Sequence, residues 1–170
     1  MRVFPAVVAV LAFASAAYAE TPVERGKYLV TISGCNDCHT PGGMLGTPDA
    51  SRVLGGSDVG FGDPASGVWI GGNLTPDPET GLGKWTTVEI VAALTKGETR
   101  EGRKLSEMMP WPALSHLSAE DASAIAAYLQ SLPPVKNAVP GPYKAGETPA
   151  VPYVSAVIPT AQYMGLPRPK

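Results

Sequence analysis

Two cysteines and a histidine lie together in the pentapeptide Cys35–His39 (CNDCH), and they constrain the fold more than any other feature of the chain. The 170-residue chain has no further cysteine and only one further histidine, His116. So few thiols and imidazoles cannot build a four-cysteine zinc site, an iron–sulfur cluster or a disulfide framework. A group bound through cysteine must therefore be bound at this one pentapeptide.

The spacing Cys-x-x-Cys-His is the attachment signature of c-type haem. Each thiol can form a thioether with one of the two vinyl groups of a porphyrin, and the adjacent imidazole then lies beneath the ring, where it can bind iron. We therefore predict one covalently bound haem c, attached through Cys35 and Cys38, with His39 as the proximal iron ligand. A thioredoxin-like thiol pair would follow a strand, whereas a helix is expected here. A zinc site would need a fourth ligand from His116 or a carboxylate.

The ligand on the opposite face of the iron separates electron carriers from proteins that bind small ligands. Met108 and Met109, two of the five methionines, lie between two expected helices. The following Pro110 stiffens this segment, so a sulfur ligand there would keep its geometry through a redox cycle. The helical pattern favours Met109 over Met108 only slightly. His116 would replace them in a bis-histidine variant.

Three short amphipathic helices are predicted from capping signals and apolar spacing. Capping boxes begin at Thr21 and Thr86, and Ser118 precedes two acidic residues at a third helix start. Glycine or proline follows each apolar pattern and ends the helix. The expected helices cover about residues 21–32, 86–97 and 118–132.

Glycine and proline dominate the rest of the chain. Residues 41–84 hold twelve glycines in forty-four positions, and so long a loop usually wraps a bound group. Within it, residues 52–54 and 68–70 could form small strands. Nine prolines follow Leu132, so this tail is expected to lie extended over the surface. We expect an all-α domain around one haem, with a long Gly-rich loop and an extended Pro-rich tail.

The first nineteen residues have the pattern of a signal peptide. Arg2 precedes an apolar run from 3 to 17, and Ala17-Tyr18-Ala19 has the small residues of a cleavage site. The run is too short to cross a bilayer, although an uncleaved anchor is the alternative reading. We predict export to the bacterial periplasm, with no permanent membrane span after cleavage. The net charge of −2 disfavours a nucleic-acid partner, because neutralising phosphates needs surplus basic groups.

With these motifs the chain resembles class I c-type cytochromes, and more closely the haem domains of cytochrome subunits of periplasmic alcohol, aldehyde and sugar-acid dehydrogenases. In that family the ligand methionine directly precedes Pro-Trp or Pro-Tyr, which implies Met109. The first and last helices also cross at a small residue, which implies Gly26 against Tyr128–Leu129. The matching stretches are Val23–Leu29, Cys35–Pro41, Gly72–Asp77, Gly81–Thr86, Met109–Trp111 and Leu117–Leu129.

The resemblance also implies a function and a domain organisation. We expect a signal peptide in 1–19, a class I cytochrome c domain in 20–135, and a Pro-rich extension in 136–170 that packs on the domain or trails from it. The protein would not be an enzyme. It would pass one electron from a dehydrogenase to a downstream cytochrome or oxidase. Those subunits usually carry two or three haem motifs and this chain has one, so an obligate subunit and a free carrier both remain open. A haem enzyme or sensor with an open sixth position is a further alternative.

Overall fold

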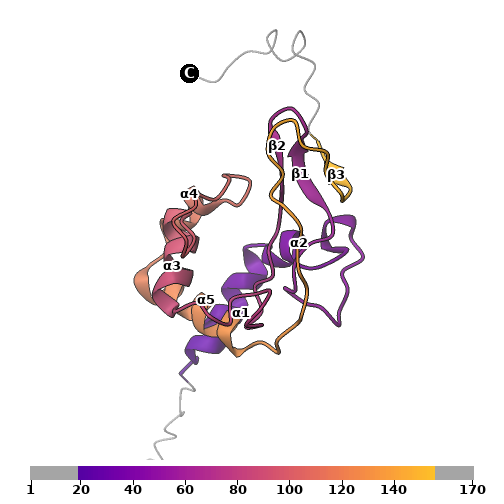
Figure 1. The fold of residues 1–170 in the computed structure, drawn as a ribbon. Helices are drawn as coiled ribbons and strands as arrows, with labels where there is room; N and C mark the ends of the chain where they lie inside the picture. Colours follow the sequence, from indigo (N-terminus) through magenta and orange to yellow (C-terminus); the bar gives the residue numbers. More distant parts are fainter. Residues whose placement is uncertain (1–18, 156–170) are drawn as a thin grey trace, which may run out of the picture.

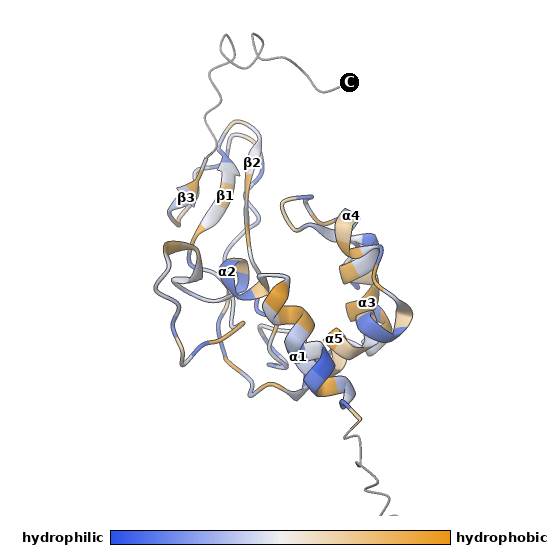
Figure 2. Ribbon diagram, turned by 180° about the vertical axis from the view of Figure 1, so that it is seen from behind, coloured by the Kyte–Doolittle hydropathy of each residue, from blue (hydrophilic) through white to orange (hydrophobic). Residues whose placement is uncertain are grey.

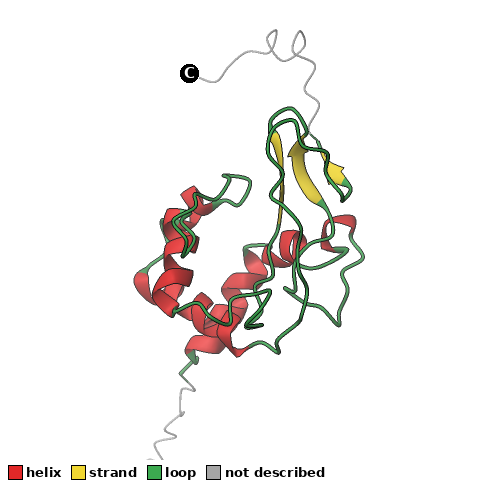
Figure 3. Cartoon of the chain, in the orientation of Figure 1, coloured by secondary structure: helices red, strands yellow, loops and turns green. Residues whose placement is uncertain are grey.

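The computed structural model describes residues 19–155, so nearly all of the predicted signal peptide and the end of the predicted extension lie outside the described residues. Within this range the helices gather on one side and a small sheet lies at the other end, joined by long loops (Figures 1 and 3). The elements in chain order are α1 (Pro22–Ile32), α2 (Cys35–His39), the 3₁₀ helix η1 (Gly43–Leu45), β1 (Gly60–Asp63), β2 (Gly67–Ile70), α3 (Thr87–Lys96), α4 (Trp111–Leu114), α5 (Ala119–Ser131) and β3 (Tyr153–Val154).

The three predicted helices are confirmed as α1, α3 and α5, and their capping signals act as expected. The Thr21 hydroxyl accepts a hydrogen bond from the backbone N–H of Glu24, and the Glu24 carboxylate accepts one from the Thr21 N–H. Thr86 and Glu89 make the same reciprocal pair at the start of α3. The Ser118 hydroxyl caps α5 alone. Each cap satisfies N–H groups that have no partner within the helix.

Helix α1 crosses α5 at Gly26, and this crossing holds the core together. A β-carbon on Gly26 would lie 2.0 Å from the carbonyl oxygen of Ala124 and 2.8 Å from Cβ of Tyr128. The expected contact between Gly26 and the Tyr128 turn is therefore confirmed. Both hydrophilic and hydrophobic residues occur in α1 and in α3 (Figure 2), and the apolar residues of these helices join those of α5 in one cluster. The buried cluster consists of Leu29, Val30, Leu54, Ile90, Leu94, Ile125, Ala126 and Leu129.

The expectation of an all-α domain is not confirmed, because the described chain contains a three-stranded sheet in the order β2-β1-β3 beside its helices. Strands β1 and β2 form an antiparallel hairpin that pairs Gly60 with Ile70. Strand β3 pairs in parallel with β1, with Gly60 opposite Tyr153. The possible strand at 68–70 is confirmed as part of β2. Glycine-rich β1 lacks the apolar alternation that would mark it as a strand in the sequence.

The possible strand at 52–54 is wrong, because these residues form turns. Leu54 has a positive φ of 58°, which a strand does not allow, and its side chain is fully buried in the core cluster. Its backbone N–H donates a 2.8 Å hydrogen bond to the buried Thr40 hydroxyl, and its carbonyl accepts one from Leu74. Burial of the leucine side chain and these two bonds hold the turn in place.

The segment after α5 lies along the domain without forming a helix within residues 133–155. It passes β2, where the N–H and carbonyl of Tyr143 pair with those of Val68 at 2.9 and 3.0 Å, and it continues to β3. Its described part therefore belongs to the packed domain. None of the helices in residues 19–155 is long and apolar enough to cross a membrane.

Candidate cofactor site

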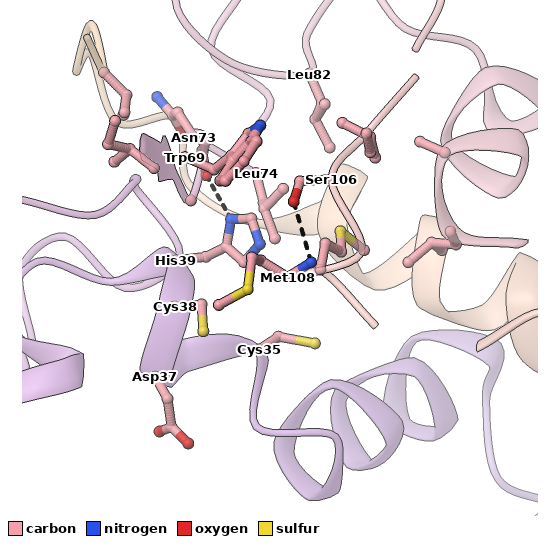
Figure 4. Close-up of a pocket in the computed structure, with 18 of the residues that line it drawn as sticks. Cys35, Asp37, Cys38, His39, Trp69, Asn73, Leu74, Leu82, Ser106 and Met108 are labelled. Atoms are coloured by element: carbon pink, nitrogen blue, oxygen red, sulfur yellow. Dashed lines mark hydrogen bonds between the residues drawn. The ribbon is translucent and has the colours of Figure 1, made fainter. Parts of the chain in front are cut away.

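Helix α2 places both thiols and the imidazole of the pentapeptide at one site. It begins directly after Gly34, whose left-handed backbone (φ 66°) turns the chain away from α1. Figure 4 shows the side chains of Cys35, Cys38 and His39 projecting from this short helix, while the Asp37 carboxylate points away from the His39 ring. Both thiols are free and partly buried.

A cavity of about 940 Å³ lies between α2 and the loop that carries Met108 and Met109. Its size is at the upper end of the range for small-molecule and cofactor sites, which are mostly apolar. The lining includes both cysteines and His39 from α2, Met44 from η1, and Met108 and Met109 from the loop before α4. Apolar lining residues from the core and loops include Leu74, Leu94 and Leu129.

His39 is oriented by the carbonyl oxygen of Gly72, which lies 2.7 Å from Nδ1. A carbonyl can only accept, so Nδ1 carries the proton and the lone pair of the neutral ring is on Nε2. Burial lowers the pKa of His39, and the hydrogen bond to Gly72 opposes that shift. The ring is therefore neutral at pH 7, with one nitrogen free to bind a metal ion.

The Gly72 carbonyl reaches His39 because the preceding residue has no side chain. A β-carbon on Gly71 would lie 1.7 Å from the carbonyl oxygen of Cys38 and 3.3 Å from Nδ1 of His39. The backbone at 71–72 thus packs directly against α2. Glycine is required at position 71 because any side chain would keep the two backbones apart.

Both thiols are protonated at neutral pH. Burial raises the pKa of Cys35 to about 11 and also raises the pKa of Cys38. Catalytic thiol pairs have lowered pKa values, since the thiolate is the reactive form. This environment is unlike that of a thiol–disulfide redox enzyme, and it agrees with thiols held beside an apolar cavity.

Both candidate methionines line the cavity, but they are packed differently. Met109 is partly buried and packs against the core cluster, whereas the side chain of Met108 is 52% exposed. Ser106 holds the backbone of both, because its hydroxyl accepts from the Met108 N–H and its carbonyl accepts from the Met109 N–H. His116 is exposed and is not part of the lining.

Two of the three tryptophans line the cavity, namely Trp69 and Trp85. The third, Trp111, is not part of the lining. Its indole packs against Gly97, and the Lys104 ammonium lies 4.1 Å from the ring centre. A β-carbon at Gly97 would overlap that indole, so glycine at the end of α3 serves both the turn and this packing.

A cluster of buried, hydrogen-bonded polar side chains lies beside the cavity, and it was not predicted from the sequence. The Asn73 amide donates to the carbonyl of Val135 at 2.6 Å and to the Thr80 hydroxyl at 3.1 Å. The Thr75 hydroxyl donates to the side-chain oxygen of Asn73 and accepts from the Val135 N–H. The Asn137 N–H donates to Thr80. The stretch Gly72–Asp77, which includes Asn73 and Thr75, was noted in the sequence for its family resemblance. Its bonds to Val135 could not be predicted from it, because Val135 lies about 60 residues later.

The residues present fit a c-type haem. The cavity is large, its walls are mainly apolar, and two protonated thiols and a neutral imidazole face it from one helix. Methionine side chains also line the cavity. In residues 19–155, no group of three or more His, Cys, Asp or Glu side chains is arranged to hold a metal ion.

Comparison with known proteins gives a family match and a set of relatives. The family model described as cytochrome c matches residues 23–133. The chain is 35% identical over 112 residues to a fructose dehydrogenase cytochrome subunit of Gluconobacter japonicus, covering 64% of this chain and 22% of that protein. It is 34% identical over 127 residues to an alcohol dehydrogenase (quinone) cytochrome c subunit of Gluconacetobacter polyoxogenes, covering 72% and 27%. A gluconate 2-dehydrogenase cytochrome c subunit of Pantoea cypripedii is 35% identical over 132 residues, covering 72% and 29%. The chain spans less than a third of the length of each of these relatives.

Proposed function

Because the chain belongs to the cytochrome c family, we propose that it is a periplasmic electron carrier with one haem, in a class I arrangement. The thiols of Cys35 and Cys38 would attach the haem, and His39 and Met109 would supply the ligands to its iron. When bound, the haem supplies a one-electron iron couple. The chain holds the group, orients its ligands and excludes water from it.

One observation carries the proposal: a five-residue helix presents two thiols and an oriented imidazole to a cavity that Met108 and Met109, from a distant loop, also line. The Gly72 carbonyl keeps the proton on Nδ1 of His39, so Nε2 is free for iron. Leucine and tryptophan walls limit water in the cavity, and a low dielectric favours the less charged, reduced centre.

Met109 is the proposed second ligand, with Met108 as the alternative. The partly buried Met109 directly precedes Pro110, and its packing against the core restricts the movement of its side chain. A packed methionine would offer its sulfur to the iron from a fixed position, and the haem would supply the one-electron chemistry. Met108 is half exposed and has less packing to hold it.

The test is an optical spectrum of both oxidation states of the purified protein, with Met109→Ala and Met108→Ala as a matched pair. We expect the weak iron–thioether band at the red end of the ferric spectrum to be lost only in Met109→Ala. Loss only in Met108→Ala would overturn the ligand assignment and leave the carrier function standing. An intact mass showing bare thiols or a cystine would refute haem attachment. Rapid carbon monoxide binding to the reduced parent protein would instead support an open sixth position.

The electron partners are proposed from the relatives, which are cytochrome subunits of dehydrogenases. A dehydrogenase would supply electrons, and a downstream cytochrome or oxidase would accept them. The signal peptide would direct export and be cleaved after Ala19, leaving the domain of 20–135 and its extension in the periplasm. Size-exclusion chromatography of a native periplasmic extract separates two forms of this role. Co-elution with a dehydrogenase supports a fixed subunit, and a small free species supports a shuttle.

A further inference from the structure

A segment after the family-matched region forms part of the cavity wall. The cytochrome c family model ends at residue 133, but residues 139–142 line the cavity. Figure 1 shows this part of the chain leaving α5 and running beside β2 toward β3. We call residues 135–143 the strap. Its contacts lie on the side of the cavity that carries His39.

The strap first contacts the backbone behind His39. The Asn137 side-chain amide donates a 2.8 Å hydrogen bond to the carbonyl of Gly55. Val139 lies against the next residue, Gly56, where a β-carbon would come within 2.3 Å of Cγ2 of the valine. The N–H of Gly56 in turn donates a 2.8 Å hydrogen bond to the carbonyl of His39. The strap therefore holds a backbone segment that is itself bonded to the proximal histidine.

The strap also contacts the backbone that orients the His39 ring. Its first residue, Val135, accepts a 2.6 Å hydrogen bond from the buried Asn73 amide and donates one to the Thr75 hydroxyl. Asn73 directly follows Gly72, whose carbonyl accepts from Nδ1 of His39. Two separate loop segments, at 55–56 and 72–75, thus meet His39 on one side and the strap on the other.

We propose that the strap is a clamp that positions His39, with Asn137 as a positioning residue. It fixes the histidine backbone through Gly55–Gly56 and the ring through Gly72–Asn73. This inference rests on the proposed function, because it assigns the strap a role in holding the proximal iron ligand. A firm hydrogen bond from Nδ1–H makes the imidazole a stronger electron donor, so a loosened clamp weakens that donation and favours reduced iron.

The experiment compares the full holoprotein with Asn137→Ala, which removes the amide bonded to Gly55. The matched control is Lys136→Ala, because the neighbouring lysine side chain is 72% exposed and pairs with Glu79 at the surface. Proton exchange with solvent is measured by NMR in the reduced protein, at the Gly56 amide and at Nδ1–H of His39. Losing one hydrogen bond of the clamp should speed exchange at both sites about five- to tenfold in Asn137→Ala and leave the control unchanged.

Two further readouts separate a clamp from a general stabilising role. Amides in α5, such as that of Leu129, should keep their exchange rates in Asn137→Ala, and the midpoint potential should rise relative to Lys136→Ala. A chain that ends after Lys144 keeps the strap and loses β3, so it should match the full chain. Unchanged exchange at Gly56 and His39, or equal acceleration in α5, would overturn the proposal. The proposal would also be overturned if exchange at Gly56 and His39 were faster only in the chain that ends after Lys144 and not in Asn137→Ala.

Haem content distinguishes failure of the clamp from failure of the proposed function. The absorbance and intact mass of each variant report whether the group is attached, whatever the exchange rates are. Absence of attached haem from the parent protein would refute the proposed function. Normal haem content with unchanged exchange would refute the clamp alone.

Discussion

The contact between Gly71 and helix α2 makes the site sensitive to a single methyl group. A β-carbon on Gly71 would lie 1.7 Å from the carbonyl oxygen of Cys38, although β-carbons essentially never come within 3.0 Å of a non-bonded heavy atom from elsewhere in the chain. In Gly71→Ala the two backbones must therefore separate by about 1.3 Å. Gly71 does not have a positive φ, so alanine adds no backbone strain and the separation alone causes the effect.

The separation moves the neighbouring carbonyl away from the histidine. The oxygen of Gly72 is 2.7 Å from Nδ1 of His39, and a retreat of the size required lengthens this distance to about 4 Å, where no hydrogen bond remains. Leaving these polar atoms unpaired costs about 1–3 kcal/mol, and overpacking adds a similar amount. We expect Gly71→Ala to lower the free energy of unfolding by about 3 kcal/mol and Tm by about 10 °C.

The assay is urea unfolding followed by circular dichroism, with Gly72→Ala as the matched control. A β-carbon on Gly72 would meet nothing within 4 Å, and this residue has no positive φ. Its variant should therefore unfold within about 0.5 kcal/mol of the parent. The NMR signal of His39 Nδ1–H should be lost or broadened only in Gly71→Ala. Equal unfolding free energies for the two variants would refute the reasoning.

Two further predictions concern the crossing of α1 and α5. Gly26→Ala places a β-carbon against the Ala124 carbonyl, so we expect the free energy of unfolding to fall by about 2 kcal/mol. Lys27→Ala is the control at an exposed position of the same helix. An increase in the Tm of Gly26→Ala would contradict this packing. The Arg25 guanidinium, hydrogen-bonded at 2.8 Å, lowers the pKa of Asp121 below its ordinary value of 3.8. Stability from this pair is present above that ordinary value and is lost as pH falls through the lowered pKa. Asp121→Asn should therefore be less stable than the parent at pH 7, and the two unfolding free energies should converge as pH falls through that lowered pKa. A constant difference at all pH values would contradict the linkage.

Local signals in the sequence were sufficient to predict the three longer helices and to identify the side chains that α2 contributes to the cavity. Capping at Thr21 and Thr86 depends on residues three positions apart, so it is legible in the sequence and is confirmed in the structure. The pentapeptide is equally local, because its five residues form one short helix. Met108 and Met109 were also found locally, and both line the cavity.

Contacts between distant segments depended on the tertiary structure. Strand β1 is rich in glycine, and it pairs in parallel with residues about ninety positions later, so no periodic pattern marks it. Leu54 was expected in a strand, but burial of its side chain in the core and the bond to Thr40 place it in a left-handed turn.

The amino-acid sequence by itself determined where the helices begin and which residues are candidates to hold a porphyrin, because these properties depend on groups within a few positions of one another. Only the tertiary structure decided how His39 is oriented, since its ring is held by Gly72 and its backbone by Gly56, both from the glycine-rich loop. It also decided that residues after Leu132 lie against that loop as a wall of the cavity. Those contacts require buried polar partners far apart in the chain, which meet only when the core has packed.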